Sequence, residues 1–186
     1  MARWRAPHTD MAKREALREL QSRLAERLQA ALTETPGVSW LAVQCAGSGF
    51  MFPLATAGEI FTAAGVLSVP HTQPWFLGVA NLRGGLHGVV DLGTFLGLRR
   101  RPPPPEALGD QARLLAFNPS SGGHCALLVD RLAGLRNLSQ LTRLPDDVQA
   151  RPSFAGARYR DAQGQVWQEI DLAALAQQDQ FLAIAA

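Results

Sequence analysis

The chain has 186 residues and a formal net charge of +2, with 47% hydrophobic and 18% charged residues. This composition is typical of a folded globular protein and excludes a disordered chain. We expect no direct membrane insertion, because no apolar stretch approaches the roughly 18 residues that a transmembrane helix needs. Residues 1–20 carry many charges and lack the apolar core of a signal peptide, which predicts a cytoplasmic protein.

The N-terminal segment, residues 1–35, is predicted to be a helical arm. Between residues 10 and 32, apolar side chains recur every three or four positions, at Leu17, Leu20, Leu24, Leu28 and Ala31. Such a stripe favours a helix that packs on its own domain. A helix that docks a partner is the second interpretation. Pro36 and Gly37 end the segment.

The positive charge is concentrated in this arm. Residues 1–33 contain seven Lys or Arg and four Asp or Glu, whereas the rest of the chain contains eleven and twelve. A body that is close to neutral lacks the basic surface that neutralises phosphates, so we expect no nucleic-acid partner. Arg99, Arg100 and Arg101 form a short basic run, which we interpret as a solvated part of a linker.

The body, residues 36–184, has a pattern of short β-strands. A first unit, about residues 38–98, is followed by an arginine- and proline-rich linker, residues 99–110. The strands of the first unit are expected at 40–45, 50–54, 75–82 and 86–92. A second unit, about residues 111–184, follows the same plan and ends in a short helix that begins at Asp171.

The two units are related by an internal repeat. Residues 76–92 and 154–172 both read Phe-x-Gly, a strand, a glycine-containing turn, a second strand and Asp-Leu. Two similar β units in one chain predict a double barrel. A residue that both copies share is expected to be structural, so Asp91 and Asp171 are predicted to cap the turns or helices that follow them.

Arg83, by contrast, has no counterpart in the second copy. It lies on a turn with Gly84 and Gly85, and the equivalent turn, residues 161–163, has no basic residue. The glycines supply the positive φ angles that a tight hairpin turn needs. Because the fold does not require Arg83, we expect its guanidinium group to bind a partner.

Motifs for catalysis or metal binding are weak in this sequence. His124 and Cys125 are a candidate base and nucleophile, but neighbours on a strand point to opposite faces and cannot pair. The other histidines are dispersed, and the two cysteines, Cys45 and Cys125, do not form a metal-ligand cluster. We therefore expect no enzymatic activity, no metal and no cofactor.

The turn and its flanking strands resemble a known signature. Residues 78–84, Gly-Val-Ala-Asn-Leu-Arg-Gly, and residues 89–92, Val-Val-Asp-Leu, resemble the signature of CheW-like chemotaxis adaptors. Residues 128–130, Leu-Val-Asp, followed by Gly134, are similar to the second signature of that family. The sequence departs from the family at Gly88, where the family often has proline.

The resemblance covers about residues 38–184. The helical arm and residues 74–81 resemble the PilI-type branch of the family, which serves the chemosensory systems of type IV pili. The resemblance implies a mainly β fold, with two five-stranded SH3-like β-barrels that share a hydrophobic interface. An N-terminal helix and a short C-terminal helix complete the expected fold.

For function, the resemblance implies a non-catalytic scaffold that joins a CheA-type histidine kinase to methyl-accepting chemoreceptors beneath the inner membrane. Asn81, Leu82, Arg83 and Gly84 match the motif that the family uses near its partner-facing surfaces. These four are therefore the candidate partner-binding residues. The alternative is a stand-alone SH3-like module that binds other regulatory proteins.

Overall fold

The structure is a computed structural model that describes residues 39–104, 107–119, 123–146 and 151–186. The predicted helical arm, residues 1–35, lies outside the described residues. The described part is mainly β and carries a few short helices, as the sequence predicts. Its strands form two mixed sheets, one of six strands and one of five.

The six-stranded sheet has the order β8-β1-β2-β11-β10-β9. Its strands are β1 (Ser39–Cys45), β2 (Ser48–Pro53), β8 (Arg131–Asn137), β9 (Thr142–Arg143), β10 (Ala155–Arg160) and β11 (Val166–Ile170). Neighbouring strands are antiparallel, except that β11 runs parallel to β2.

The five-stranded sheet has the order β3-β6-β7-β5-β4. Its strands are β3 (Ala57–Thr62), β4 (Phe76–Leu82), β5 (Gly85–Asp91), β6 (Arg113–Phe117) and β7 (Cys125–Val129). As in the larger sheet, one neighbouring pair is parallel, here β5 and β7, and the other three pairs of this sheet are antiparallel.

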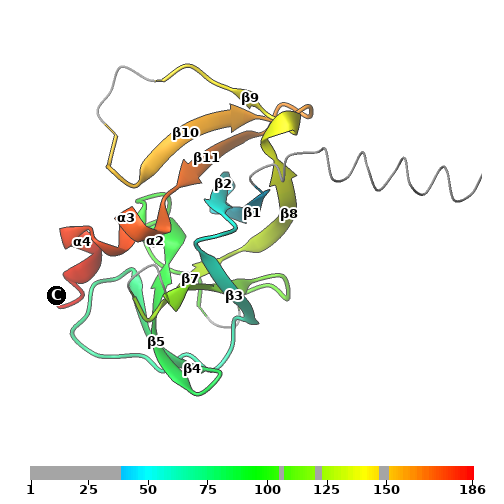
Figure 1. The fold of residues 1–186 in the computed structure, drawn as a ribbon. Helices are drawn as coiled ribbons and strands as arrows, with labels where there is room; N and C mark the ends of the chain where they lie inside the picture. The colour runs from blue at the N-terminus through cyan, green and yellow to red at the C-terminus, as the bar shows by residue number, and fades with distance from the viewer. Residues whose placement is uncertain (1–38, 105–106, 120–122, 147–150) are drawn as a thin grey trace, which may run out of the picture. The chain divides into compact units, whose positions relative to one another are not determined.

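Each sheet contains strands from both units of the repeat. β1 and β2 belong to the first unit but lie in the sheet of β8 to β11, as the blue and cyan strands beside orange β11 show in Figure 1. Conversely, β6 and β7 of the second unit lie in the sheet of β3, β4 and β5. Each exchanged pair of strands is joined to its host sheet on both sides, by the parallel pairs β2–β11 and β7–β5 and by the antiparallel pairs β1–β8 and β6–β3.

The expectation of two five-stranded barrels is therefore wrong in two respects. Neither sheet closes on itself within the described residues, because β8 and β9 end one ladder and β3 and β4 end the other. In addition, neither unit builds a sheet alone. A sequence repeat reports that two segments have the same local pattern, and it does not specify which strands pair.

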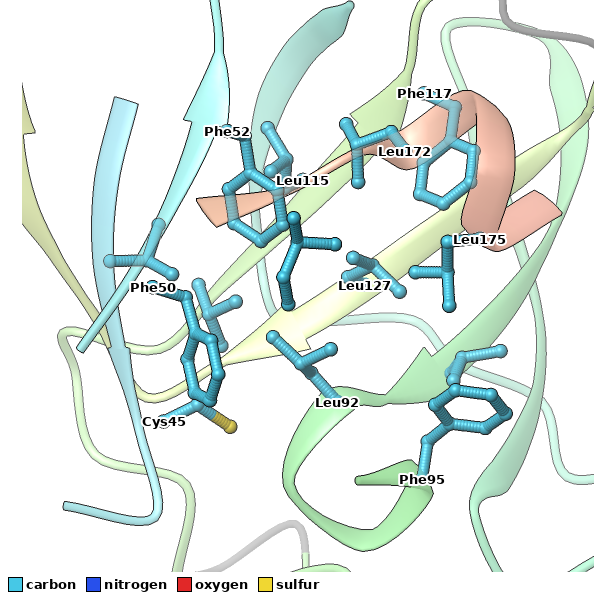
Figure 2. Close-up of a cluster of buried hydrophobic side chains, with 14 of the residues drawn as sticks. Cys45, Phe50, Phe52, Leu92, Phe95, Leu115, Phe117, Leu127, Leu172 and Leu175 are labelled. Atoms are coloured by element: carbon cyan, nitrogen blue, oxygen red, sulfur yellow. The ribbon is translucent and has the colours of Figure 1, made fainter. Parts of the chain in front are cut away.

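The central strands are buried on both faces, which explains their nearly continuous apolar sequence. On β6, Leu115 and Phe117 enter a core between the two sheets, whereas Leu114 and Ala116 enter a separate core of the five-stranded sheet. Figure 2 shows the core between the sheets, which also contains Cys45, Phe50, Phe52, Leu92, Phe95, Leu127, Leu172 and Leu175. A third core lies on the other face of the six-stranded sheet, around Trp40, Ala42, Met51 and Trp167.

Short helices follow both hairpins of the repeat. α2 (Leu92–Phe95) begins after Asp91, whose carboxylate accepts a hydrogen bond from the Thr94 N–H. α3 (Leu172–Ala176) begins after Asp171, whose carboxylate accepts from two backbone N–H groups, and α4 (Asp179–Leu182) follows it. The predicted capping role of both aspartates is confirmed, and so is the short C-terminal helix.

Candidate functional site

Arg83 lies on the two-residue turn that joins β4 to β5. Leu82 and Gly85 pair across this turn, and Arg83 and Gly84 have φ angles of 50° and 83°. Positive φ at both central residues is typical of a type I′ turn, whose twist matches that of the hairpin. The Gly84 N–H donates to Asn81 Oδ1 at 2.8 Å, which ties the turn to β4. The backbone of Arg83 is therefore held in a defined turn conformation.

The left-handed conformation of Arg83 is costly for a residue with a Cβ atom. Glycine or asparagine would occupy this position with less strain. A strained non-glycine residue that the surrounding turn holds in place is a reason to look for a binding role. Its side chain is 75% exposed, so the guanidinium group is accessible to a partner.

The four candidate residues have different surroundings. Asn81, Arg83 and Gly84 are exposed, whereas Leu82 is only 7% exposed and packs in the core of the five-stranded sheet. Of the four, Arg83 is the one with a long, exposed side chain. Asn81 stabilises the turn by accepting a hydrogen bond from the Gly84 N–H, and the Leu82 side chain anchors the end of β4 in the core.

An acidic side chain of a neighbouring strand pairs with Arg83. The Glu59 carboxylate of β3 accepts a hydrogen bond from Arg83 Nη1 at 2.8 Å, and the Glu59 side chain is itself 50% exposed. Exposed pairs of this kind stabilise a fold only weakly, by about 0.2–1 kcal/mol. The ion pair therefore orients the Arg83 guanidinium group, but it is weak enough for another protein to displace Glu59.

Beneath this ion pair lies a pocket of about 370 Å³, which we call the hairpin pocket. Its lining includes apolar side chains from three strands, Phe61 of β3, Leu82 of β4 and Ala116 of β6. Arg83 and Glu59 line the same pocket, so it combines an apolar floor with a charged pair. Such a combination suits a protein segment that carries both an apolar and a charged side chain.

His124 and Cys125 do not form a catalytic pair. The Cys125 side chain packs against the core between the sheets, and burial raises the pKa of its thiol. The His124 ring instead meets the His87 ring edge to face, with centroids 5.5 Å apart. Among the residues that the structure describes, no group of three or more His, Cys, Asp or Glu side chains is placed to hold a metal ion.

Sequence reasoning missed the role of Arg99. The sequence predicts a solvated side chain, as for Arg100 and Arg101, but the Arg99 side chain is only 20% exposed and pairs with both Asp91 and Asp130. These pairs raise the pKa of the Arg99 guanidinium further above its usual value, although burial opposes the shift. Two aspartates at the ends of buried strands, Asp91 in β5 and Asp130 after β7, are a signal that a cation must approach them.

The ion pair between Arg83 and Glu59 was also not predicted. Glu59 lies on β3, which is not among the strands that the sequence pattern predicts, so nothing in the sequence places it beside the hairpin. Within the described ranges, no helix is both long and apolar enough to cross a membrane.

Comparisons with known proteins agree with the fold and the hairpin. The sequence model of the CheW-like domain matches residues 39–180. The protein PilI of Pseudomonas aeruginosa is 29% identical over 167 residues, which cover 88% of this chain and 89% of PilI. The crystal structure of the scaffolding protein TtCheW from Thermoanaerobacter tengcongensis superposes with a TM-score of 0.64 at 16% identity, over 80% of this chain and 93% of that one.

At 16% identity, the structural likeness establishes the fold alone. The match to the family model, in contrast, spans most of the chain and includes the hairpin that carries Arg83. The chain therefore belongs to the CheW-like domain family of chemotaxis adaptors.

Proposed function

We propose that this chain is a non-catalytic adaptor that couples methyl-accepting chemoreceptors to a CheA-type histidine kinase. The observation that carries the proposal is Arg83, an exposed guanidinium group on an ordered turn above an apolar pocket. A guanidinium group offers up to five donors in fixed directions and can bind a carboxylate with two of them. It therefore suits a specific, reversible contact with another protein.

An adaptor transmits a signal by binding both partners with affinities that depend on their conformations. This role needs stable surfaces and no reacting group. The hairpin surface fits it, because Asn81, Arg83 and Gly84 are exposed while Leu82 anchors the strand in a core. We propose these four residues as part of a surface that contacts the kinase or the receptor.

The likeness to PilI supports a role in the chemosensory system of type IV pili, and hence in twitching motility. We propose that the chain acts in the cytoplasm and is recruited to receptor arrays at the inner membrane. The alternative, a stand-alone module for other regulatory proteins, predicts a different set of partners.

The proposal can be tested by measuring the affinity of the full chain for the purified kinase and for receptor-containing membranes. Arg83→Gln removes the charge without placing a second carboxylate beside Glu59. We expect binding to at least one partner to weaken about tenfold or more, as for an interface hot spot. Arg100→Gln, at an exposed linker position, is the matched control and should bind normally. Wild-type protein that binds neither partner would contradict the proposed function.

A further inference from the structure

The six-stranded sheet has a hollow in the place that corresponds to the hairpin pocket. The hairpin pocket is lined by the β4–β5 hairpin and by β3 and β6, the strand pairs at the two edges of the five-stranded sheet. The second hollow is lined by the β10–β11 hairpin and by β8 and β1, which hold the corresponding places in the larger sheet. It has a volume of about 770 Å³, and we call it the polar hollow.

A β-bulge places two arginines of β8 on the side of the polar hollow. Arg131 pairs with Gln44 and Arg136 pairs with Trp40, and the ladder shifts register between these pairs. In a regular strand, two residues separated by an odd number of positions point to opposite faces. The bulge, next to Gly134 with φ of 89°, brings both guanidinium groups to the same face.

Neither guanidinium group forms an ion pair with a carboxylate of the described residues. Arg131 Nε donates to Gln44 Oε1 at 2.9 Å, and Arg136 Nη1 donates to the Leu135 carbonyl at 3.2 Å. The Arg136 guanidinium also lies 5.3 Å from the centroid of the Trp167 ring. This cation–π contact holds the guanidinium group over the indole, and Arg136 lines the hollow.

The carboxylate in the lining, Asp161, is already occupied. It accepts hydrogen bonds from Trp167 Nε1 at 2.9 Å and from the backbone N–H groups of Gln165 and Gln163 at 2.9 and 3.0 Å. Burial alone would raise the pKa of Asp161, but these hydrogen bonds and the charge of Arg136 lower it. Asp161 therefore stays ionised within its own turn, and the two arginines give the hollow an excess of positive charge.

We propose that the polar hollow is a second docking surface, and that it binds an acidic segment of a partner protein. Arg131 and Arg136 offer donors for carboxylates, which guanidinium groups bind in a forked geometry. The exposed amides of Gln140 and Gln163 can bind the backbone of such a segment, and the half-buried Leu141 offers it an apolar contact. This second docking surface does not depend on the proposed function.

The charge of the surrounding body favours a protein over a nucleic acid or an anionic membrane. Residues 34–186 contain eleven Lys or Arg against twelve Asp or Glu, so this part of the chain carries no net positive charge. Binding to a polyanion depends on neutralising many phosphates at once. Two arginines beside Asp161 are matched instead to a few carboxylates in a defined arrangement.

The two pockets carry opposite charge arrangements. In the hairpin pocket, the hairpin supplies the cation, Arg83, and the edge strand supplies the anion, Glu59. In the polar hollow, the hairpin supplies the anion, Asp161, and the edge strand supplies the cations. The guanidinium groups that can bind carboxylates thus lie on the hairpin in one pocket and on the edge strand in the other, and this difference in arrangement lets the two surfaces select different partners.

The test uses the full chain and a fluorescein-labelled peptide of repeated Glu-Glu-Leu units as the probe. We expect the variant Arg131→Gln/Arg136→Gln to bind this peptide about tenfold or more weakly than the wild type. Arg100→Gln/Arg101→Gln, which loses the same charge at exposed linker positions, should stay within about twofold, as should Arg83→Gln. Thermal unfolding checks the fold of each variant. Should the double variant unfold, Arg131→Gln alone keeps the Trp167 stack and is expected to lose about threefold.

Any one of three results overturns the proposal. The first is no saturable binding of the peptide to the wild type, and the second is an equal loss of peptide affinity in the linker variant. The third is tighter binding of a single-stranded oligonucleotide of the same charge. The peptide is neither the kinase nor the receptor, so these results do not bear on Arg83. Loss of kinase or receptor binding in Arg83→Gln, measured separately, decides the proposed function.

Discussion

Asp91 and Asp130 are bound by the same guanidinium group, that of Arg99. Asp91 is fully buried, and both of its carboxylate oxygens accept hydrogen bonds from Arg99. Asp130 accepts from Arg99 Nη1 at 2.9 Å and from the Ala46 N–H at 2.7 Å, in the turn between β1 and β2. The network therefore ties the start of α2 and the end of β7 to the six-stranded sheet, and it holds the two sheets together.

Replacing Arg99 should destabilise the fold strongly. Arg99→Met keeps an apolar side chain of similar length but leaves the buried carboxylate of Asp91 without its counter-charge. Breaking a buried pair in this way costs about 3–5 kcal/mol of unfolding free energy. Urea denaturation of Arg99→Met and of Arg100→Met measures the effect, and the exposed control should stay within about 0.5 kcal/mol. Equal stability of the two variants would contradict a structural role for the network.

The shared glycine of the two repeats should tolerate a methyl group differently in each copy. Gly78 has φ of 132°, and a Cβ atom there would overlap the carbonyl oxygen of Leu67, whose backbone pairs with Val79. At Gly156, the nearest atoms to an added Cβ belong to the Glu169 side chain, which can rotate away. Neither the φ strain nor the backbone overlap of Gly78 is present at Gly156.

We therefore expect Gly78→Ala to lower the free energy of unfolding by about 3 kcal/mol or more, since backbone strain alone costs about 1–3 kcal/mol. Gly156→Ala should cost about 1 kcal/mol, a usual value for a point substitution. Chemical denaturation of the two variants compares them directly. A larger loss for Gly156→Ala would show that the repeats differ in another way.

The sequence predicted local structure well because local structure depends on neighbouring residues. The hairpin around Arg83 follows from Gly84 and Gly85, and the caps at Asp91 and Asp171 follow from a carboxylate that precedes a short helix. Each of these features is encoded within a few positions and is present in the structure.

Long-range pairing could not be predicted in the same way. The exchange of β1–β2 with β6–β7 conserves every local pattern, so the sequence is equally compatible with exchanged and unexchanged sheets. The burial of Arg99 could not be predicted either, because its two partners, Asp91 and Asp130, come from different units and meet only in the folded chain. Glu59 reaches Arg83 only once β3 lies at the edge of the five-stranded sheet. The missing information is tertiary in each case.

Cys45 should make stability depend on alkaline pH. Burial raises the pKa of its thiol from 9.0 to about 12; nearby Asp130 adds to this shift, and Arg99 opposes it. Below about pH 9 the thiol is protonated in both states and contributes nothing to the pH dependence. Between about pH 9 and 12 only the unfolded state releases the proton, so the folded state loses stability as pH rises.

The expected slope is up to about 1.4 kcal/mol per pH unit from this residue. It is measured as the difference between wild type and Cys45→Ala in unfolding free energy across that range, which removes the contributions of all other groups. Parallel curves for the two proteins would contradict the shift. Native Cys45 should also resist iodoacetamide at pH 8, because its thiol is buried and protonated.

Glu59 is expected to compete with partners for Arg83. The Glu59 carboxylate, 2.8 Å from Arg83 Nη1, competes for the guanidinium donors with a carboxylate of another protein. An exposed pair contributes about 0.2–1 kcal/mol, which corresponds to a change of up to about fivefold in affinity. Glu59→Gln should therefore tighten the binding of any partner that uses Arg83 by about twofold to fivefold, with thermal stability nearly unchanged.

A double-mutant cycle shows whether this gain depends on Arg83. The affinity of the kinase and of the receptor is measured for Glu59→Gln, for Arg83→Gln and for the variant with both substitutions. If Glu59 acts by holding Arg83, its substitution tightens binding in the wild-type background and has no effect once Arg83 is gone. An equal gain in both backgrounds would mean that Glu59 repels the partner directly. Weaker binding in Glu59→Gln would mean instead that Glu59 orients the guanidinium group for its partner.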